Sequence, residues 1–269
     1  MDSADEVTGA GARRQTVVVK VGGSTLPHRE AVLADLGTLA EAGLATVVVH
    51  GGGAALTEWL KRLGKESEFC DGERITDAET LEAAIMVFAG TVNKQLVALM
   101  SAAGLSAVGL CGVDGGLVQA QRQIEPDVGL VGQTTEVRVG LLQLLLDGGM
   151  IPVLAPLVLG AQGQILNINA DTLAGDVARA LGASQIVFLT DVPGVRGADG
   201  AIISTLSAED ASRLRQDGTI SGGMIPKVEA CLRCLDRVPQ AAILDGSVLH
   251  GLRAHVLDGA TAGTMFRRE

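Results

Sequence analysis

Short, almost continuous apolar runs recur along this chain, and two of the earliest end directly in glycines. Residues 17–21 lead into 22–23, and residues 46–50 lead into 51–53. A strand with one face in water alternates apolar and polar residues, whereas a parallel strand covered on both faces is apolar almost throughout. These runs therefore predict parallel strands buried inside a sheet, with glycine loops at their carboxyl ends.

Segments with apolar residues at helical spacing separate the strands, as in residues 32–40. Thr76 and Glu79 are spaced as in a capping box and predict the start of a long helix toward Met100. Further strands are predicted at 107–111, 151–154 and 186–189, helices at 54–64, 139–147, 170–182 and 223–236, and hairpins or loops at 125–133 and 159–168. Buried strands alternating with helices indicate an α/β chain with a mostly parallel sheet.

The net charge limits the possible binding partners, and the aromatic content limits the composition of the core. The formal charge is 21 − 31 = −10, which argues against nucleic acid or an anionic membrane as a general partner. An anionic ligand must therefore be held by local donors. Only four Phe, one Trp and no Tyr are present, so the core must be aliphatic.

The cysteines and the amino-terminal residues indicate the cellular compartment in which the protein is expected. Four scattered cysteines are too few for a disulfide framework, and Cys231 and Cys234 are interpreted as small apolar residues on one helix face rather than as metal ligands. Residues 1–15 predict a disordered leader without the features of a signal peptide. No stretch approaches the roughly 18 uninterrupted apolar residues of a membrane span. We therefore expect a cytoplasmic protein.

Glycines after parallel strands lie where α/β sheets bind ligands, although a glycine pair can equally form only a tight turn. The P-loop pattern is absent, and the dinucleotide fingerprint fails because Leu56 occupies the place of its third glycine. Lys20 lies inside an apolar strand, where burial is costly unless an anion meets it; the alternative is a lysine that reaches solvent from the strand end.

Several motifs occur in a particular order: Lys20 with Gly22–Gly23, the glycines after His50, Asn167-x-Asn169-x-Asp171, and a glycine pair before Lys227. In this order they resemble the amino acid kinase family. Residues 16–269 resemble in particular its acetylglutamate kinase branch, most specifically at 64–77 and 90–94.

The resemblance implies an open αβα sandwich with two lobes. Residues 16–170 would form the lobe for the acyl acceptor and residues 171–269 the lobe for ATP. The reaction implied is transfer of the γ-phosphoryl group of ATP to the side-chain carboxylate of N-acetyl-L-glutamate, in arginine biosynthesis. Its acyl acceptor is ionised near neutrality, so no general base is needed.

The resemblance also implies the roles of individual residues. Lys20 and Lys227 would stabilise the transferring phosphoryl group, and Asp171 would hold both lysines by charge pairing. Gly23 and Gly52 would donate backbone N–H bonds to phosphate oxygens. His50 is interpreted as a residue that orients the glycine loop, and His28, His250 and His255 as surface residues.

The same resemblance implies the contacts with the substrates. Arg74 would bind the α-carboxylate through paired N–H bonds, Asn167 the amide end, and Gly52–Gly53 the side-chain carboxylate. Glu73, beside Arg74, departs from the family pattern and is expected to face solvent. Mg²⁺ would be held mainly by phosphates and water, without a protein metal site. Nucleotide contacts are expected from Asp191, Val192, Pro193, Gly194, Val195, Arg196, Thr219, Ile220 and Ser221.

Other functions stay open at this point. A related carboxylate kinase would act on aminoadipate or aspartate, because Arg74 and Asn167 do not measure chain length. A non-catalytic nucleotide-binding regulator and a nicotinamide-dependent oxidoreductase are further alternatives. Because the leader is short and contains Gly9 and Gly11, we expect a homodimer that arginine does not strongly inhibit.

Overall fold

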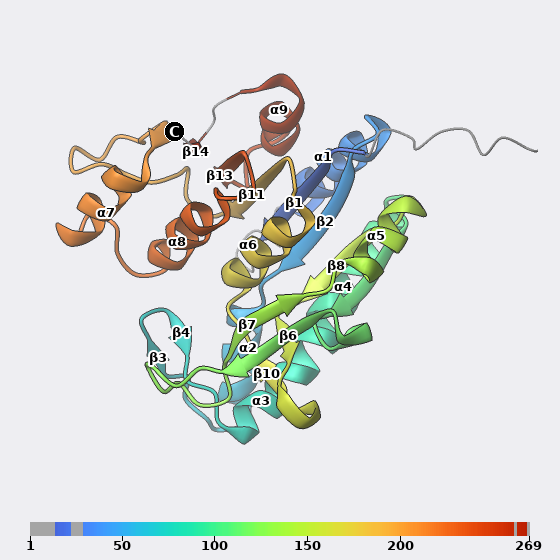
Figure 1. Ribbon diagram of the computed structural model, residues 1–269, viewed down its shortest axis with the longest axis vertical. Helices are drawn as coiled ribbons and strands as arrows, with labels where there is room; N and C mark the ends of the chain where they lie inside the picture. Colours follow the sequence, from blue (N-terminus) through green and yellow to red (C-terminus); the bar gives the residue numbers. More distant parts are fainter. Residues whose placement is uncertain (1–13, 23–28, 261–262, 268–269) are drawn as a thin grey trace, which may run out of the picture.

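The computed structural model describes residues 14–22, 29–260 and 263–267 (Figure 1). Most of the predicted leader, together with Gly23 and His28, lies outside these residues. The described chain forms one large sheet with helices packed on both of its faces. The predicted α/β class is therefore confirmed.

Within the described ranges, the large sheet has eight strands in the order β12-β14-β13-β11-β1-β2-β8-β5. Its strands are β1 (Thr16–Val21), β2 (Ala45–His50), β5 (Ala107–Cys111), β8 (Ile151–Ala155), β11 (Gln185–Thr190), β12 (Thr205–Leu206), β13 (Gln240–Asp245) and β14 (Gly263–Arg267). The six strands from β13 to β5 are mutually parallel, whereas β14 is antiparallel to β13 and β12 runs with β14.

Residues of the central strands alternate between two aliphatic cores. Val17 and Val19 of β1 lie in the core under one set of helices, and Val18 lies in the core under the other. The first set is α1 (Arg29–Glu41), α4 (Asn93–Ala102) and α9 (Gly251–Asp258), and the second is α5 (Gly140–Asp147), α6 (Ala170–Leu181) and α8 (Met224–Cys234). Because both faces are covered, the strands read as continuous apolar runs in the sequence.

A smaller sheet and a hairpin extend from one end of the large sheet. The small sheet has the order β10-β9-β6-β7, and the hairpin joins β3 (Phe69–Cys70) to β4 (Glu73–Arg74). The small sheet consists of β6 (Val118–Arg122), β7 (Gly132–Val137), β9 (Leu157–Leu159) and β10 (Ile165–Asn167). The predicted loops at 125–133 and 159–168 are largely the connections of its two hairpins, but the pairing of those hairpins was not predicted.

The long helix after position 76 is present but begins differently from the prediction. It runs through α3 (Ala78–Ala84), the π-helix η2 (Ile85–Val92) and α4. Its N-cap is Asp77, whose carboxylate accepts from the Thr80 N–H at 2.9 Å, so the assignment of the cap to Thr76 was wrong. Thr76 is buried instead, and its hydroxyl donates to the Arg74 carbonyl at 2.8 Å.

Of the described residues, one continuous helix, Ala78–Ala102, is long and apolar enough to cross a membrane by length and composition alone. Its Leu81, Val87, Val92 and Met100 are buried against the rest of the protein. A core helix passes the same two criteria.

The parallel order brings the glycine loops together. β1 lies between β2 and β11, and all three end at the same edge of the sheet. Gly51 N–H donates to the Val21 carbonyl at 2.9 Å, and Gly22 N–H donates to the Leu189 carbonyl at 3.1 Å. The sheet is thus continuous across the predicted lobe boundary, which falls in the first turn of α6; the two-lobe division stays a prediction.

Candidate active site

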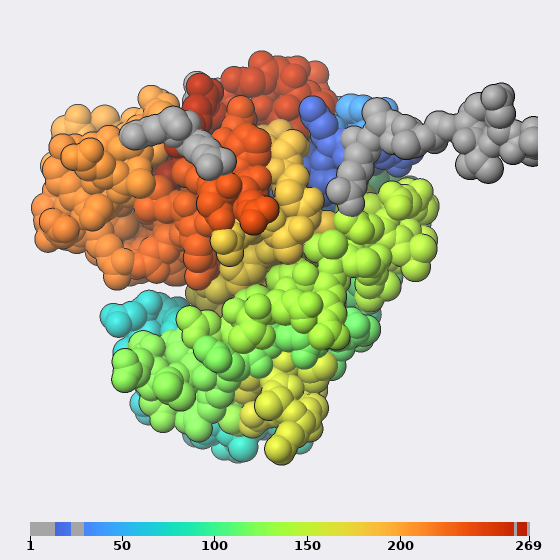
Figure 2. All heavy atoms as spheres, in the orientation of Figure 1, coloured from blue at the N-terminus to red at the C-terminus, as the bar shows by residue number. Residues whose placement is uncertain are grey.

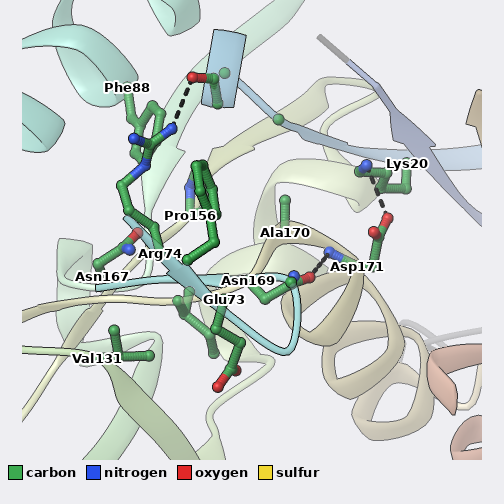
Figure 3. Close-up of a pocket in the computed structure, with 16 residues that line it drawn as sticks. Lys20, Glu73, Arg74, Phe88, Val131, Pro156, Asn167, Asn169, Ala170 and Asp171 are labelled. Carbon is green, nitrogen blue, oxygen red and sulfur yellow. Dashed lines mark hydrogen bonds and ion pairs between the residues drawn. The ribbon is translucent and has the colours of Figure 1, made fainter. Parts of the chain in front are cut away.

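A cavity of about 190 Å³ opens at the carboxyl ends of the central strands. Figure 2 shows the surface hollowed between the cyan region of the β3–β4 hairpin and the orange region of the carboxy-terminal part. Among the residues that line the cavity are six of those singled out from the sequence: Lys20, Gly52, Gly53, Arg74, Asn167 and Asp171. Figure 3 shows how several of them converge.

A buried carboxylate lies between two lysines at one side of this cavity. Asp171 Oδ1 is 2.7 Å from the Lys20 ammonium, and Oδ2 is 3.1 Å from the Lys227 ammonium. The side chains of Lys20 and Asp171 are only 7% and 6% exposed. Lys20 therefore does not reach solvent from the strand end, which was the alternative interpretation of this residue.

The start of α6 fixes the position of Asp171. Asn169 is the N-cap: its side-chain oxygen accepts from the N–H groups of Asp171 and Thr172 at 2.8 and 3.2 Å. Asp171 lies in the first turn, where the helix dipole stabilises a negative charge. The cap thus belongs to Asn169, and the carboxylate of Asp171 is free to meet the lysines from β1 and α8.

The three charges shift one another's proton affinity. Burial alone would raise the pKa of Asp171, but the charges of Lys20 and Lys227 outweigh it and hold that pKa below its ordinary value. Burial also lowers the pKa of Lys20, and the like charge of Lys227 adds to this effect against the attraction of Asp171. Two cations and one carboxylate leave a net positive charge, which suits an anionic ligand.

Arg74 faces the opposite side of the cavity and is 7% exposed. Its Nη2 donates to the Gly53 carbonyl at 2.9 Å and the Thr57 hydroxyl at 2.8 Å, and its Nη1 donates to the Ser67 hydroxyl. Its guanidinium also lies over the Phe69 ring, 4.6 Å from the ring centroid.

All of these Arg74 partners are electrically neutral. No carboxylate of the described residues lies within ion-pair distance of Arg74. Burial lowers the pKa of the guanidinium, which nonetheless stays charged near neutrality. Three of its five N–H donors are engaged, which leaves two for a ligand. A buried cation without a protein counter-charge marks a position for an anionic ligand.

The expectation that Glu73 faces solvent is only partly right. Adjacent residues of a strand point to opposite faces, so the carboxylate of Glu73 points away from Arg74 (Figure 3). However, Glu73 is half-buried, lines the cavity and accepts from Gln123 Nε2 at 2.6 Å. Gln123, which directly follows β6, thus restrains this charge, and the sequence alone did not indicate this contact.

Asn167 lies at the end of β10, close to Arg74. Its Nδ2 donates to the Thr76 hydroxyl at 3.1 Å, and its backbone N–H donates to the Leu130 carbonyl at 3.0 Å. The side chain is thereby held at the cavity wall, with its oxygen available to accept from a ligand amide.

The glycine loop leaves no room for a side chain at Gly52. A Cβ atom on Gly52 would lie 2.8 Å from a ring carbon of Phe88. In the part of the chain that the structure describes, no backbone acceptor is bonded to the Gly52 N–H, which lies at the cavity. This loop therefore offers an exposed backbone donor to an anion.

Of the three histidines that the structure describes, one differs from the interpretation. His50 is completely buried, and its Nδ1 is 2.7 Å from the Gly51 carbonyl, in keeping with contact to the glycine loop. His250 is exposed and pairs with Asp35 at 3.1 Å. His255 is not a surface residue: it is 5% exposed, and its Nδ1 is 3.0 Å from the Ala260 carbonyl.

The residues expected at the nucleotide lie outside the cavity described above. Asp191 follows β11 at the same edge of the sheet and contributes to the field at Lys20. Val195 and Ile220 are buried core residues, so only their backbone could contact a ligand. Gly194 has no space for a Cβ atom, which would lie 2.7 Å from the Thr264 hydroxyl oxygen.

Cys231 and Cys234 are buried free thiols on α8, as interpreted. Burial raises the pKa of both thiols, and Cys234 donates to the Cys231 carbonyl at 3.1 Å. No group of three or more His, Cys, Asp or Glu side chains is arranged to hold a metal ion in the described ranges.

Sequence reasoning missed the side chains that support the cavity: Thr57, Ser67, Phe69, Asn93 and Gln123. Ser67, Phe69 and Asn93 lie in segments that the motif analysis singled out, but their partners are far away in the sequence. Spacing therefore carried no signal for their contacts.

Comparisons with known proteins indicate the family of this chain. Residues 15–245 match the model of the amino acid kinase family. The chain is 44% identical over 270 residues to an acetylglutamate kinase of Methylobacterium nodulans, covering 94% of this chain and 89% of that protein. It is 45% identical over 257 residues to an acetylglutamate kinase of a Synechococcus species, covering 93% and 82%.

A solved structure with a similar fold is an N-acetylglutamate synthase of Neisseria gonorrhoeae complexed with coenzyme A and N-acetyl-glutamate. The TM-score is 0.84 at 25% identity, covering 95% of this chain and 60% of that one.

Replacing Asp171 with Asn should destabilise the protein and shift its pH profile. The change leaves two lysines beside a neutral group, and loss of one partner from a buried pair costs about 3–5 kcal/mol. Without the carboxylate the pKa of Lys20 falls further, so its charge is lost at lower pH and the alkaline limit of any activity moves down. Urea unfolding and a pH–rate profile measure both effects.

Asp127→Asn provides the control, because solvent screens the exposed Asp127–Arg122 pair, which should contribute little to stability. Equal stability of the Asp171 and Asp127 variants would contradict a structural role for the two-lysine cluster.

Proposed function

The chain belongs to the amino acid kinase family, and from this membership we propose that the cavity between Lys20, Lys227 and Arg74 carries out phosphoryl transfer to a carboxylate. The reaction is the ATP-dependent phosphorylation of N-acetyl-L-glutamate at its side-chain carboxylate, a step of arginine biosynthesis. The product is N-acetyl-L-glutamyl 5-phosphate.

One observation carries the assignment of the reacting groups. Two lysines meet on one buried carboxylate at one end of the cavity, and an arginine without a counter-charge lies at the other. An acceptor with two carboxylates separated by a short carbon chain matches this arrangement: one carboxylate pairs with Arg74 and the other approaches the lysines. The reacting carboxylate is already ionised near pH 7, because a glutamate-like group has a pKa of about 4.3.

We assign Lys20 and Lys227 to the transferring phosphoryl group. Phosphoryl transfer depends on positioning and on neutralising charge on the equatorial oxygens, which two ammonium groups from β1 and α8 can provide. Asp171 keeps the two cations close together despite their repulsion. Gly52 donates its backbone N–H to a phosphate oxygen, and Gly23, outside the described residues, is assigned the same role.

We assign acceptor binding to Arg74, Asn167 and the loop at Gly52–Gly53. Arg74 binds the α-carboxylate through its uncompensated charge and its remaining donors on Nε and Nη1. The side-chain oxygen of Asn167 accepts from the N–H of the acetamido group, since its Nδ2 is engaged with Thr76. The glycine loop binds the reacting carboxylate next to the lysines.

We assign nucleotide binding to residues 191–196 and 219–221, with Val195 and Ile220 contributing through their backbone because their side chains are buried. The adjacency of β11 to β1 supports this assignment, since it brings the loop after β11 next to Lys20. Mg²⁺ is proposed to bind with ATP, held mainly by phosphates and water. This arrangement needs no protein cage of carboxylates.

We further propose a cytoplasmic homodimer in which residues 16–170 bind the acceptor and residues 171–269 bind ATP. Two features support a second copy of the chain. Strand β5 lies at the edge of the large sheet in the described residues, and all five of its residues are partly exposed. Met86, on the neighbouring helix η2, is 56% exposed. An open strand edge beside an apolar helix face favours pairing with another copy.

A coupled assay with several acceptors tests the function. N-acetylglutamate, glutamate, aminoadipate, aspartate and carbamate are offered with ATP and Mg²⁺, and any acyl phosphate is trapped with hydroxylamine. We expect trapped product with N-acetylglutamate above all others. Preference for aminoadipate or aspartate would assign a different acceptor, and the absence of product with every acceptor would indicate a non-catalytic regulator.

Lys227→Ala should lower kcat about 10²–10³-fold and change the acceptor KM less than about threefold. The ammonium gains most as charge builds on the transferring group, so its loss affects the transition state more than the bound substrate. Steady-state kinetics measure this effect, with Lys61→Ala, a change at an exposed position of α2 (Gly53–Arg62), as the control. An effect confined to KM would remove Lys227 from the transfer step.

Arg74→Lys should show the opposite pattern. A point charge cannot replace the planar guanidinium, so KM for N-acetylglutamate should rise about 10–100-fold while kcat changes only a few-fold. The matched control is Arg122→Lys, at a surface ion pair. Unchanged kinetics in the Arg74 variant would show that the acceptor lies elsewhere.

Met86→Glu should dissociate the proposed dimer. A carboxylate at this exposed apolar position would be buried without a partner if a second copy covered it. Light scattering should give about twice the 27.5 kDa chain mass for the unchanged protein and about one chain mass for the variant. A hexamer with sigmoidal inhibition by arginine would contradict both the dimer and the expected insensitivity to arginine.

A further inference from the structure

A chain of hydrogen bonds runs from the exposed Lys94 through the buried Asn93 and His50 to the glycine loop. His50 is the last residue of β2 and is fully buried. Its Nδ1 is 2.7 Å from the Gly51 carbonyl, and its Nε2 is 3.1 Å from Asn93 Nδ2. Asn93 in turn contacts Val153 on β8 and its own neighbour Lys94.

The two outer partners determine which way the Asn93 amide points. The Val153 carbonyl, 2.9 Å from Asn93 Nδ2, can only accept, and the Lys94 ammonium, 3.0 Å from Asn93 Oδ1, can only donate. Nδ2 must therefore be the nitrogen, and its second N–H points at His50. The Nε2 atom of His50 must accept, which leaves the ring proton on Nδ1, where it donates to the Gly51 carbonyl.

The local backbone is built to bring these side chains together. Asn93 directly follows the π-helix η2. A π-helical turn changes the direction in which the side chains after it point. On β5, Gly109 accepts from Lys94 at 3.2 Å, and a Cβ atom there would collide with the Asn93 side chain.

Holding the Gly51 carbonyl also holds the next N–H group. The Gly51–Gly52 peptide is a planar trans unit, in which the C=O and the N–H point in opposite directions. Glycines on both sides put little steric restraint on rotation of this peptide. Its orientation thus depends on the bond from His50.

We propose that Asn93 and Lys94 are positioning residues for phosphoryl transfer, which hold His50 in the Nδ1–H tautomer so that the Gly52 N–H is directed into the cleft. The proposal rests on the function proposed above for Gly52. It assigns a role to the Asn93–Lys94 pair, which the sequence motif singled out without one.

The electrostatics of the ring agree with a neutral histidine. Burial lowers the pKa of His50 to about 4, and the charges of Lys20 and Lys94 add to that effect. These two cations are the charged groups that face the ring. A neutral ring with one proton is what the hydrogen-bond chain requires.

The first test measures the tautomer directly on the full chain. Two-bond proton–nitrogen NMR correlations of ¹⁵N-histidine distinguish Nδ1–H from Nε2–H rings, with His50 assigned through His50→Gln. We expect His50 to be neutral with its proton on Nδ1 from pH 8 down to about 5. A proton on Nε2 overturns the proposal, whatever the substrate of the enzyme.

The second test exchanges the donor for an acceptor with Asn93→Asp. The introduced carboxylate cannot donate to Nε2, so the neutral ring moves its proton to Nε2 and releases the Gly51 carbonyl. We expect kcat to fall about 10–100-fold at pH 8 with a change in acceptor KM of less than about threefold. The introduced carboxylate also raises the pKa of His50, so at lower pH the ring gains a second proton and Nδ1–H bonds Gly51 again. The kcat ratio of variant to wild type should therefore recover several-fold by pH 6.

Thr46→Val is the matched control, since Thr46 is buried on the same strand and its hydroxyl has no partner in the described residues. We expect it to keep wild-type kcat and the wild-type tautomer. An unchanged kcat for Asn93→Asp, or a loss of the same size at every pH, overturns the positioning role. If wild type phosphorylates no acceptor, the proposed function fails, while the NMR result still decides the tautomer.

Discussion

The contact of two lysines with one buried carboxylate connects the whole architecture of this site. Lys20 comes from the central strand β1, Lys227 from the first half of α8, and Asp171 from the first turn of α6. Bringing two ammonium groups this close is unfavourable unless a counter-charge lies between them. The position of Asp171 in turn depends on the Asn169 cap and on the close packing of α6 against the sheet and α8, where Gly175 faces Ala230.

On the opposite side of the cavity, the described residues hold Arg74 by neutral groups and not by an ion pair. Arg74 is surrounded by neutral oxygens and an aromatic ring, so its position is fixed while its charge stays uncompensated. The carboxylate of the neighbouring residue, Glu73, points the other way and is bound by Gln123. The two lysines at one end of the cavity already have Asp171 as a counter-charge, whereas Arg74 at the other end has none among the described residues. The two ends can therefore bind two different anions, one that reacts and one that anchors the ligand.

Backbone groups complete the site because the glycine loops meet at one edge of a parallel sheet. The Gly52 amide is available because a glycine fits against Phe88, where a side chain would not. Its direction depends on His50, whose only bonding partners in the described chain are Gly51 and Asn93. Ionic contacts thus place the charges, and a buried neutral network places the backbone donor between them.

The amino-acid sequence by itself determined the class of fold, the order of the main strands and helices, the aliphatic core and most of the cavity. Lys20 stood out because a strand buried on both faces is apolar almost throughout, so a charged residue in it is conspicuous. The glycine runs after β1 and β2 stood out because an anion site needs backbone N–H groups that no side chain covers. Arg74, Asn167 and Asp171 were identified through their motifs. These signals are local in the chain.

Only the tertiary structure decided what depends on distant partners. The contact of Thr76 with Asn167, the burial of His255, the restraint of Glu73 by Gln123 and the bond of Asn93 to His50 each depend on how the chain packs. The pairing of the small sheet and the antiparallel β14 are of the same kind. A hydrogen bond or ion pair forms where two groups lie within about 3 Å of each other, and for residues tens of positions apart only the folded chain determines that distance.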